Sequence, residues 1–163
     1  IADIADVICE SLRKGGKLII FGNGGSAADA QHIAAELIGR FQKERRALAA
    51  LALTTNTSVL TALANDYGYE TVFSRQLEAL ADKKDVVLAI STSGKAKNVI
   101  EAVKLAKSIG IKTIAFTGQR GWELAKLADI ALIVPAKITA RIQEAHITVG
   151  HILCELIEDE LTK

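Results

Sequence analysis

The stretch KLIIFGNGGS at residues 17–26 runs from a short apolar segment straight into a glycine-rich turn. A second stretch, DVVLAISTSG at residues 85–94, has the same arrangement with a turn rich in hydroxyl groups. Both apolar segments are continuous rather than alternating, which is typical of strands that are buried on both faces of a parallel sheet. The two stretches therefore predict strands over 17–21 and 85–90, each followed by a polar loop.

On either side of these stretches, apolar runs alternate with segments of helical periodicity. This alternation predicts an α/β fold in which a five-stranded parallel sheet has helices on both faces, a three-layer αβα sandwich. No linker or repeat interrupts residues 1–163, so we expect a single domain. Because the chain starts at Ile1 and contains no methionine, we expect part of the native N-terminal segment to precede it. Further strands are predicted over 47–53, 112–116 and 130–134, and helices over 3–14, 26–40, 59–64, 71–80, 97–108, 122–127 and 139–160.

The composition excludes several classes of partner. The formal net charge is +1 with scattered basic residues, and only 4% of the residues are aromatic, so neither a nucleic-acid surface nor its stacking side chains are expected. The apolar runs are too short to cross a bilayer, and no secretory signal is visible. Cys9 and Cys154 stand alone, without metal-finger spacing, and indicate small buried thiols in a reducing cytoplasm.

The two strand exits carry the small polar residues that a phosphate group needs. In a parallel sheet, ligands bind beyond the carboxyl ends of the strands. Glycines let the backbone approach an anion closely, and the N–H groups that open the next helix face it. Tight turns with helix caps use similar residues, but two such exits in one small domain favour a phosphate site. The hydroxyl donors would be Ser26, Ser91, Thr92 and Ser93.

A dinucleotide site is the nearest rival for the first exit, because Gly22, Gly24 and Ala27 satisfy the weak pattern GxGxxA after a strand. Such a domain would place an acidic residue after its second strand to hold the ribose. Residues 53–56 are Leu-Thr-Thr-Asn and contain no acid. The sequence therefore argues against NAD binding.

A second group of polar residues lies on two predicted helices. His32 and Glu36 are one turn apart and share a helix face. This spacing suits a metal site or an acid/base pair. The same pair also occurs on an ordinary solvated helix face. The last helix adds Gln143, His146 and His151, of which His146 falls off the common face and is expected to be structural. Gln143 and His151 are separated by roughly 12 Å of helical rise. One small ion could take both only if the helix bends or if two subunits contribute.

With these motifs in view, the chain resembles the sugar isomerase (SIS) domain family and, within it, the phosphoheptose isomerases. The resemblance extends over essentially the whole chain and in register. The matching segments are residues 22–27 (GNGGSA), 29–36, 64–69 (ANDYGY), 90–94 (ISTSG), 139–144 (TARIQE) and 151–154 (HILC).

The resemblance implies a reversible aldose–ketose isomerisation of D-sedoheptulose 7-phosphate to D-glycero-D-manno-heptose 7-phosphate, the first step toward nucleotide-activated heptose. Glu36 would be the base that moves a proton between C1 and C2 through an enediol. His151 would be its acid/base partner at the substrate oxygen. A positioned carboxylate and a proton donor are what this chemistry needs.

The resemblance also implies further ligands and a quaternary structure. Some family members hold one zinc ion at the positions of His32, Glu36, Gln143 and His151, where it would stabilise the enediolate but compete with Glu36 as a free base. Members are homotetramers with sites between subunits, and the heptose supplies glycoconjugates such as lipopolysaccharide. The residues implied for the phosphate, the sugar hydroxyls or the pocket shape are Asn23, Gly24, Gly25, Ser26, Arg40, Asn65, Asp66, Ser91, Thr92, Ser93, Thr139 and Gln143.

One loop departs from the family pattern, which commonly continues as Ser-Gly-Asn-Ser where this chain has Ser93-Gly94-Lys95-Ala96. A phosphate-binding hydroxyl is therefore missing at Ala96. Lys95 either compensates with its charge or is a solvated loop residue.

Two other functions remain as alternatives to the isomerase. A non-catalytic SIS relative that binds the replication initiator lacks the acid at Glu36 and the histidine at His151, and this chain has both. A phosphosugar-sensing SIS module usually accompanies a DNA-binding domain, and none is seen in this sequence. The isomerase is favoured over both.

Overall fold

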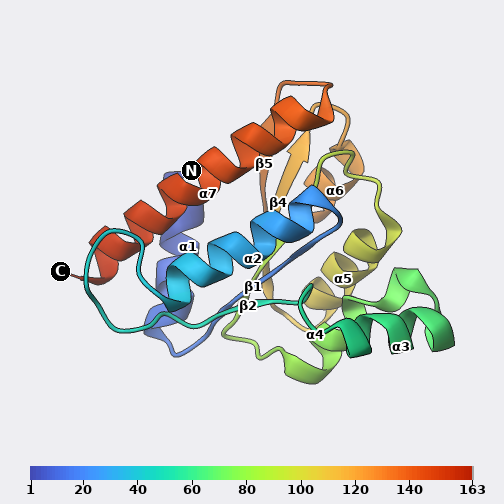
Figure 1. Cartoon of the computed structure of the whole chain (residues 1–163), viewed down its shortest axis with the longest axis horizontal. Coiled ribbons are helices and arrows are strands. Elements are labelled where there is room, and N and C mark those ends of the chain that lie inside the picture. The colour runs from blue at the N-terminus through green and yellow to red at the C-terminus, as the bar shows by residue number, and fades with distance from the viewer. Residues whose placement is uncertain (163) are drawn as a thin grey trace.

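The computed structural model describes residues 1–162, so Lys163, the last residue of the predicted domain, lies outside the described part. Its centre is a five-stranded sheet in the order β2-β1-β3-β4-β5, in which every pairing is parallel (Figure 1). The predicted α/β architecture is confirmed. The strands are β1 (Leu18–Gly22), β2 (Ala50–Ala52), β3 (Val86–Ser91), β4 (Lys112–Gly118) and β5 (Ile130–Val134).

Helices occupy the connections between these strands, and the alternation predicted from the periodicity is present. None of the helices within residues 1–162 combines the length and the apolar character needed to cross a membrane. The α-helices are α1 (Ala2–Arg13), α2 (Gly25–Ile38), α3 (Thr57–Tyr67), α4 (Ser74–Leu80), α5 (Lys97–Ser108), α6 (Trp122–Leu127) and α7 (Thr139–Leu161), with a 3-10 turn η1 (Tyr69–Thr71).

Several elements differ from their predicted bounds by a few residues: the helix predicted over 59–64 spans Thr57–Tyr67, the helix predicted over 26–40 ends at Ile38, and the strand predicted over 112–116 continues to Gly118. The strand predicted over 47–53 pairs with β1 only over Ala50–Ala52, because it lies at the sheet edge and has a partner on one side. The helix predicted over 71–80 begins at Ser74, since the preceding η1 turn takes up residues 69–71. Apolar runs and helical spacing locate elements better than they locate element ends.

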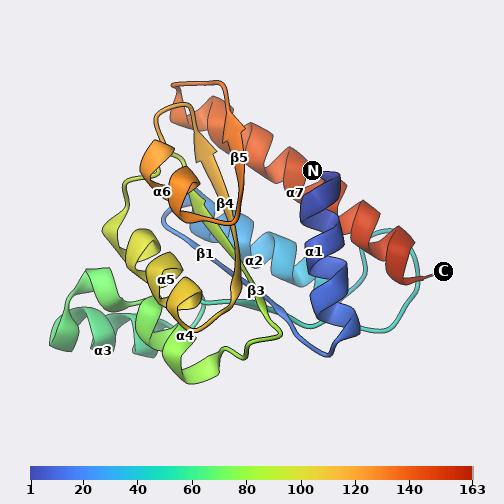
Figure 2. The same ribbon diagram turned by 180° about the vertical axis from the view of Figure 1, so that it is seen from behind.

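The alternating side chains of the buried strands form two separate cores. Leu18 and Ile20 of β1 lie in a core with α1, α2 and α7, whereas Ile19 and Phe21 lie in a second core with α4, α5 and α6. Figures 1 and 2 show these helices on the two faces of the sheet. Helix α3 has no buried residue and projects from the edge of the molecule (Figure 1).

The sheet order fixes where a ligand can bind. The chain crosses from β1 to one edge at β2 and then returns to β3 on the other side of β1. The loops after β1 and β3 therefore diverge at the point where the strand order reverses, which is the preferred ligand crevice of open parallel sheets. Gly22 and Ile90 are register partners at this edge, so the two predicted polar loops start side by side.

Candidate active site

A polar cavity of about 300 Å³ lies between the two strand-exit loops. It is formed by the loop after β1, the start of α2, the loop after β3 and the start of α7. Ser26 and Ser91 are buried in its wall. The residues around it are Asn23, Gly24, Gly25, Ser26, Ile90, Ser91, Thr92, Ser93, Ala96, Thr139 and Gln143.

Local hydrogen bonds fix the shape of the second loop, which follows β3. Gly94 has φ +62°, a left-handed conformation that glycine adopts without strain, and its N–H donates to the Ser91 side chain at 3.1 Å. The Lys95 N–H donates to the Ser93 side chain at 3.2 Å. Within residues 1–162, the hydroxyls of Ser26 and Thr92 have no hydrogen-bond partner. These two hydroxyls remain available to a ligand.

Asn23 is used to hold the first loop in place. Its side-chain amide exchanges two hydrogen bonds of 2.9 Å with Asn98 of α5, and the Tyr69 hydroxyl donates to its Oδ1 at 3.0 Å. Asn98 is buried, whereas Tyr69 is exposed. Sequence reasoning missed both partners: Asn98 belongs to no motif, and Tyr69 lies in the matching segment 64–69 but was given no role. Asn23 therefore shapes the cavity and has little free capacity for a sugar hydroxyl.

Gln143 of α7 lies against the first loop. A β-carbon built on Gly25 would be 2.3 Å from Nε2 of Gln143, so only glycine lets the amide approach this closely. Within residues 1–162, Gln143 makes no hydrogen bond with the histidines of the site. The structure thus places Gln143 beside the first strand-exit loop, without a hydrogen bond to the other predicted metal ligands within residues 1–162.

The remaining three predicted metal ligands meet on the facing sides of α2 and α7. His32 Nε2 lies 2.9 Å from His151 Nε2 and 3.3 Å from Glu36 Oε1. The side chains of His32 and Glu36 are 49% and 25% exposed, so a substrate can reach them. The three residues form a chain with His32 in the middle, within which proton transfer is possible.

The same arrangement bears on a metal ion. His32 Nε2 lies next to both the Glu36 carboxylate and the Nε2 atom of His151. All three groups can donate an electron pair, so a proton or a metal cation placed among them would be bound by more than one of them. Tetrahedral zinc would hold such donors roughly 3.3 Å apart, and the observed spacing is similar. The donor types fit zinc. Within residues 1–162, however, no group of three or more His, Cys, Asp or Glu side chains is already assembled as a metal site.

Cys154, one turn below His151 on α7, is a buried free thiol, as predicted. Burial raises its pKa to about 12, and the nearby Glu36 carboxylate adds to the shift. The thiol is protonated at neutral pH and is not a nucleophile.

A buried ion pair braces the other end of this helix pair. Glu158 of α7 accepts hydrogen bonds from the N–H groups of Phe41, Gln42 and Lys43 and from Arg45 Nε at 2.9 Å. Arg45 in turn donates to the carbonyl of Glu36 at 2.9 Å. Burial alone would raise the pKa of Glu158, but these donors outweigh it and lower the pKa. The sequence offered no signal for this pair, whose members lie 113 residues apart.

The predicted structural role of His146 agrees with its position. It is fully buried, its Nε2 lies 3.3 Å from the Thr117 carbonyl, and burial lowers its pKa. It is therefore neutral at pH 7, and it is absent from the lining of the polar cavity within residues 1–162.

Three other predicted residues do not join the cavity. Arg40 is exposed and lies 3.8 Å from Glu44. Asn65 and Asp66 are exposed on the projecting helix α3 and bond to each other at 2.8 Å. Among residues 1–162, these three are not part of the lining of the polar cavity.

Comparisons with known proteins agree with this geometry. The SIS domain family model matches residues 1–118. A phosphoheptose isomerase of Aquifex aeolicus is 59% identical over 98% of this chain and 83% of its own length. A probable phosphoheptose isomerase of Thermoplasma acidophilum is 60% identical over 98% of this chain and 88% of its own length.

Solved structures give the same result. A phosphoheptose isomerase from Neisseria gonorrhoeae superposes with a TM-score of 0.91 at 48% identity, and one from Francisella tularensis with 0.93 at 38%. Each match covers 97% of this chain and 84% of the other. The fold and most of the chain are thus shared with these proteins.

Proposed function

The chain belongs to the phosphoheptose isomerases of the SIS domain family, and we infer from this premise how its residues divide the work of an aldose–ketose isomerase. The substrate pair is D-sedoheptulose 7-phosphate and D-glycero-D-manno-heptose 7-phosphate. The observation that supports the division most directly is that Glu36 and His32, on the helix α2 that opens at the polar cavity, meet His151 of α7. A phosphate anchor and a proton-transfer group then lie on one rigid element.

Glu36 acts as the base. Its carboxylate removes a proton from C1 of the ketose, the electron pair forms the C1–C2 double bond of the enediol, and the same carboxylate returns the proton to C2. His151 exchanges protons with the two substrate oxygens, giving one to the carbonyl oxygen as the enediol forms. His32, at 2.9 Å from His151 and 3.3 Å from Glu36, links the two groups and fixes their orientation.

The length of α2 suits an extended substrate. Ser26 and Glu36 are separated by roughly 15 Å of helical rise, and helical side chains lean toward the N-terminus, which shortens this span. With the phosphate at Ser26, Ser91, Thr92 and Ser93, C1 and C2 would reach the level of His32 and Glu36. The sugar hydroxyls between them would meet Gln143 and Thr139, which line the cavity.

Zinc is part of this proposal, with one ion per subunit. His32, Glu36 and His151 would hold it, and Gln143 would join them after turning away from Gly25; Glu36 would have to release the ion to act as the free base. Bound zinc would polarise the substrate oxygens as a Lewis acid. Metal analysis of protein purified without chelator tests this, with His32→Ala as the variant expected to lose the ion and His146→Ala as a control. Equal zinc in wild type and His32→Ala would contradict the assignment.

A homotetramer with sites between subunits would account for the residues that one chain leaves outside its cavity. Asn65 and Asp66 lie on α3, which has no buried residue of its own. Tyr67 and Tyr69 nearby are more than half exposed. In an oligomer, this helix would present Asn65 and Asp66 to a neighbouring site, and Arg40 would be free to turn toward substrate.

The cellular role that follows is the first step of nucleotide-activated heptose synthesis, which supplies lipopolysaccharide and related glycoconjugates. We assign the enzyme to the cytoplasm. Cys9 and Cys154 are both buried and form no disulfide within residues 1–162, which supports a reducing compartment.

The decisive experiment is turnover of D-sedoheptulose 7-phosphate by the purified chain, followed by a coupled assay for the aldoheptose phosphate. We expect reversible conversion. Binding of the sugar phosphate without any turnover would instead support a sensing role, and the absence of both would remove the substrate assignment.

A further inference from the structure

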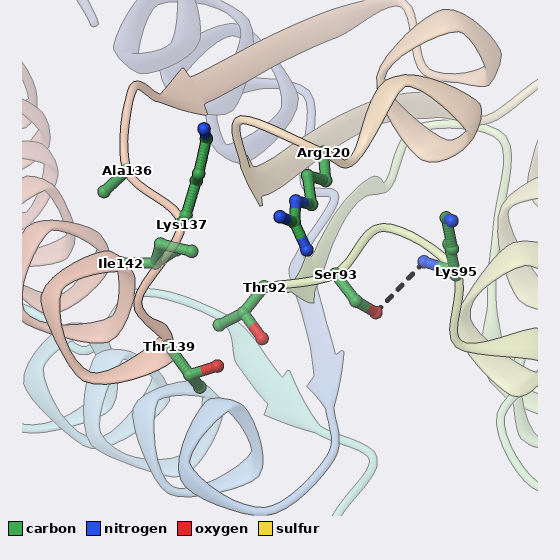
Figure 3. A pocket seen from close by; sticks show the side chains of 8 residues that line it. All are labelled: Thr92, Ser93, Lys95, Arg120, Ala136, Lys137, Thr139 and Ile142. Carbon is green, nitrogen blue, oxygen red and sulfur yellow. Dashed lines mark hydrogen bonds between the residues drawn. The ribbon is translucent and has the colours of Figure 1, made fainter.

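A second cavity of about 270 Å³ adjoins the polar one and is lined by three cations, Lys95, Arg120 and Lys137. Figure 3 shows the guanidinium of Arg120 extending toward Thr92 and Ser93, with Lys137 and Lys95 on either side of it in this view. No carboxylate is among its lining residues. We call this group of three side chains the cation cluster.

The two cavities share one wall. Thr92, Ser93 and Thr139 line both of them. The polar cavity offers hydroxyls, amides and backbone groups but has no charged side chain in its own lining. A phosphate dianion bound in the polar cavity would therefore meet no cation in that cavity. The cation cluster lies in the adjoining cavity, behind the shared wall of Thr92 and Ser93.

The cluster is not committed to other partners. Within residues 1–162, neither Lys95, Arg120 nor Lys137 makes an ion pair or a side-chain hydrogen bond. Other basic side chains are paired: Lys17 with Asp85, Lys107 with Asp129, and Arg141 with Glu144. Three unpaired cations around one cavity repel one another, so an anion bound there would lower that repulsion.

The backbone fixes the cluster in place. The three cations come from the loops after β3, β4 and β5. Gly118 N–H donates to the Thr92 carbonyl at 3.0 Å, and Gln119 N–H donates to the Ala136 carbonyl at 3.2 Å. A β-carbon on Gly94 would lie 2.3 Å from the Cα of Gly121, so these two loops touch backbone to backbone. The positions of the charges are set by the fold rather than by chance side-chain proximity.

We propose that the cation cluster supplies the counter-charge for the substrate's phosphate group and determines the preference for phosphorylated ligands. This inference rests on the proposed function, because it assigns charge recognition to the same phosphate end. It also gives Lys95 a role: its charge takes over from the hydroxyl that the side chain of Ala96 cannot provide.

The test compares two triple variants with the same change in charge. The first variant, Lys95→Gln/Arg120→Gln/Lys137→Gln, removes the cluster. The control, Lys83→Gln/Lys84→Gln/Lys112→Gln, removes three lysines at the amino-terminal ends of β3 and β4, at the other end of the strands. We expect the first to raise KM for the phosphosugar about tenfold at low salt, as three screened cations worth about twofold each would do. We expect kcat to change less than threefold, and the control variant to keep both constants within twofold.

Salt and a charge-for-hydroxyl exchange sharpen the test. The KM difference between wild type and the first variant should shrink at high salt, because screening removes the attraction. Lys95→Asn/Ala96→Ser should keep phosphate affinity but reduce its salt dependence. An unchanged KM in the first variant, or an equal rise in the control, would overturn the proposal.

Inorganic phosphate separates this proposal from the proposed function. Its binding by calorimetry requires no turnover, and we expect the first triple variant to bind it about tenfold more weakly than wild type. If the wild type fails to isomerise the heptulose phosphate yet shows this difference, the cation cluster stands and the substrate assignment fails. Equal phosphate binding by the two triple variants would overturn the proposal for the cation cluster and leave the proposed isomerase function standing.

Discussion

The two ends of the candidate site are built in different ways. The end that we propose for the phosphate consists of loops at the carboxyl ends of the strands, with Gly22 and Ile90 held as register partners. The proton-transfer end consists of side chains on α2 and α7, where His32 and His151 are 119 residues apart in sequence and 2.9 Å apart in space. One end depends on the sheet, and the other depends on how two helices pack.

This difference predicts which changes each end tolerates. Backbone groups and short hydroxyls at the sheet edge keep their places as long as the sheet persists. The helix pair also needs the brace at its far end, where Glu158 and Arg45 join α7 to the loop after α2. We therefore expect substitutions at the two ends to separate KM from kcat, and substitutions at the brace to affect stability.

The largest effect should come from the proton-transfer end. Glu36→Gln keeps the size of the side chain but removes the base, and we expect kcat to fall by about 10³-fold while phosphosugar binding stays measurable. Steady-state kinetics with the coupled assay gives both constants. Glu144→Gln, an exposed change on α7, serves as the control. A rate for Glu36→Gln within a few-fold of wild type would remove its role as base.

The next effect should appear in stability. Glu158→Gln leaves the buried Arg45 without its counter-charge, since the two side chains are only 1% and 4% exposed. We expect a loss of about 3 kcal/mol in the free energy of unfolding, measured by urea denaturation. Glu155→Gln, an exposed position on the same helix, should change it by less than about 0.5 kcal/mol.

The same brace has a pH signature. The pKa of Glu158 is lower in the folded chain than its ordinary value. The ionised carboxylate therefore adds its full share to the free energy of unfolding at pH values above the pKa of the unfolded chain. This share is lost as the pH falls through the pKa of the folded chain. Wild-type stability should therefore decline in the acid range below about pH 4.5, more steeply than that of Glu158→Gln. Parallel declines would show that the carboxylate is not preferentially ionised in the fold.

The smallest effect should come from the phosphate end. Ser26→Ala removes one buried hydroxyl from a cavity with several donors, and we expect KM to rise about tenfold with kcat nearly unchanged. Ser108→Ala, at the exposed end of α5, is the control. A fall in kcat with constant KM would move Ser26 from the phosphate to the reacting carbons and would weaken the contrast between the two ends.

The sequence alone predicted the layers and the place of the phosphate loops. Continuous apolar runs such as Val86–Ser91 identify buried parallel strands, and a glycine-rich turn at a strand exit implies an anion site by local geometry. The pairing of His32 with Glu36 also followed, because one helical turn brings them together. These features depend on residues that are close in the chain.

What the tertiary structure decided depends on contacts between distant segments. Only the packing of α7 on α2 brings His151 to His32 and leaves Gln143 beside Gly25. Only the strand order brings Lys95, Arg120 and Lys137 around one cavity. Periodicity and turn chemistry act over a few residues, whereas these placements are set by the two cores and by backbone contact between loops. The place of the two strand-exit loops was therefore readable from sequence, and the charge that surrounds them was not.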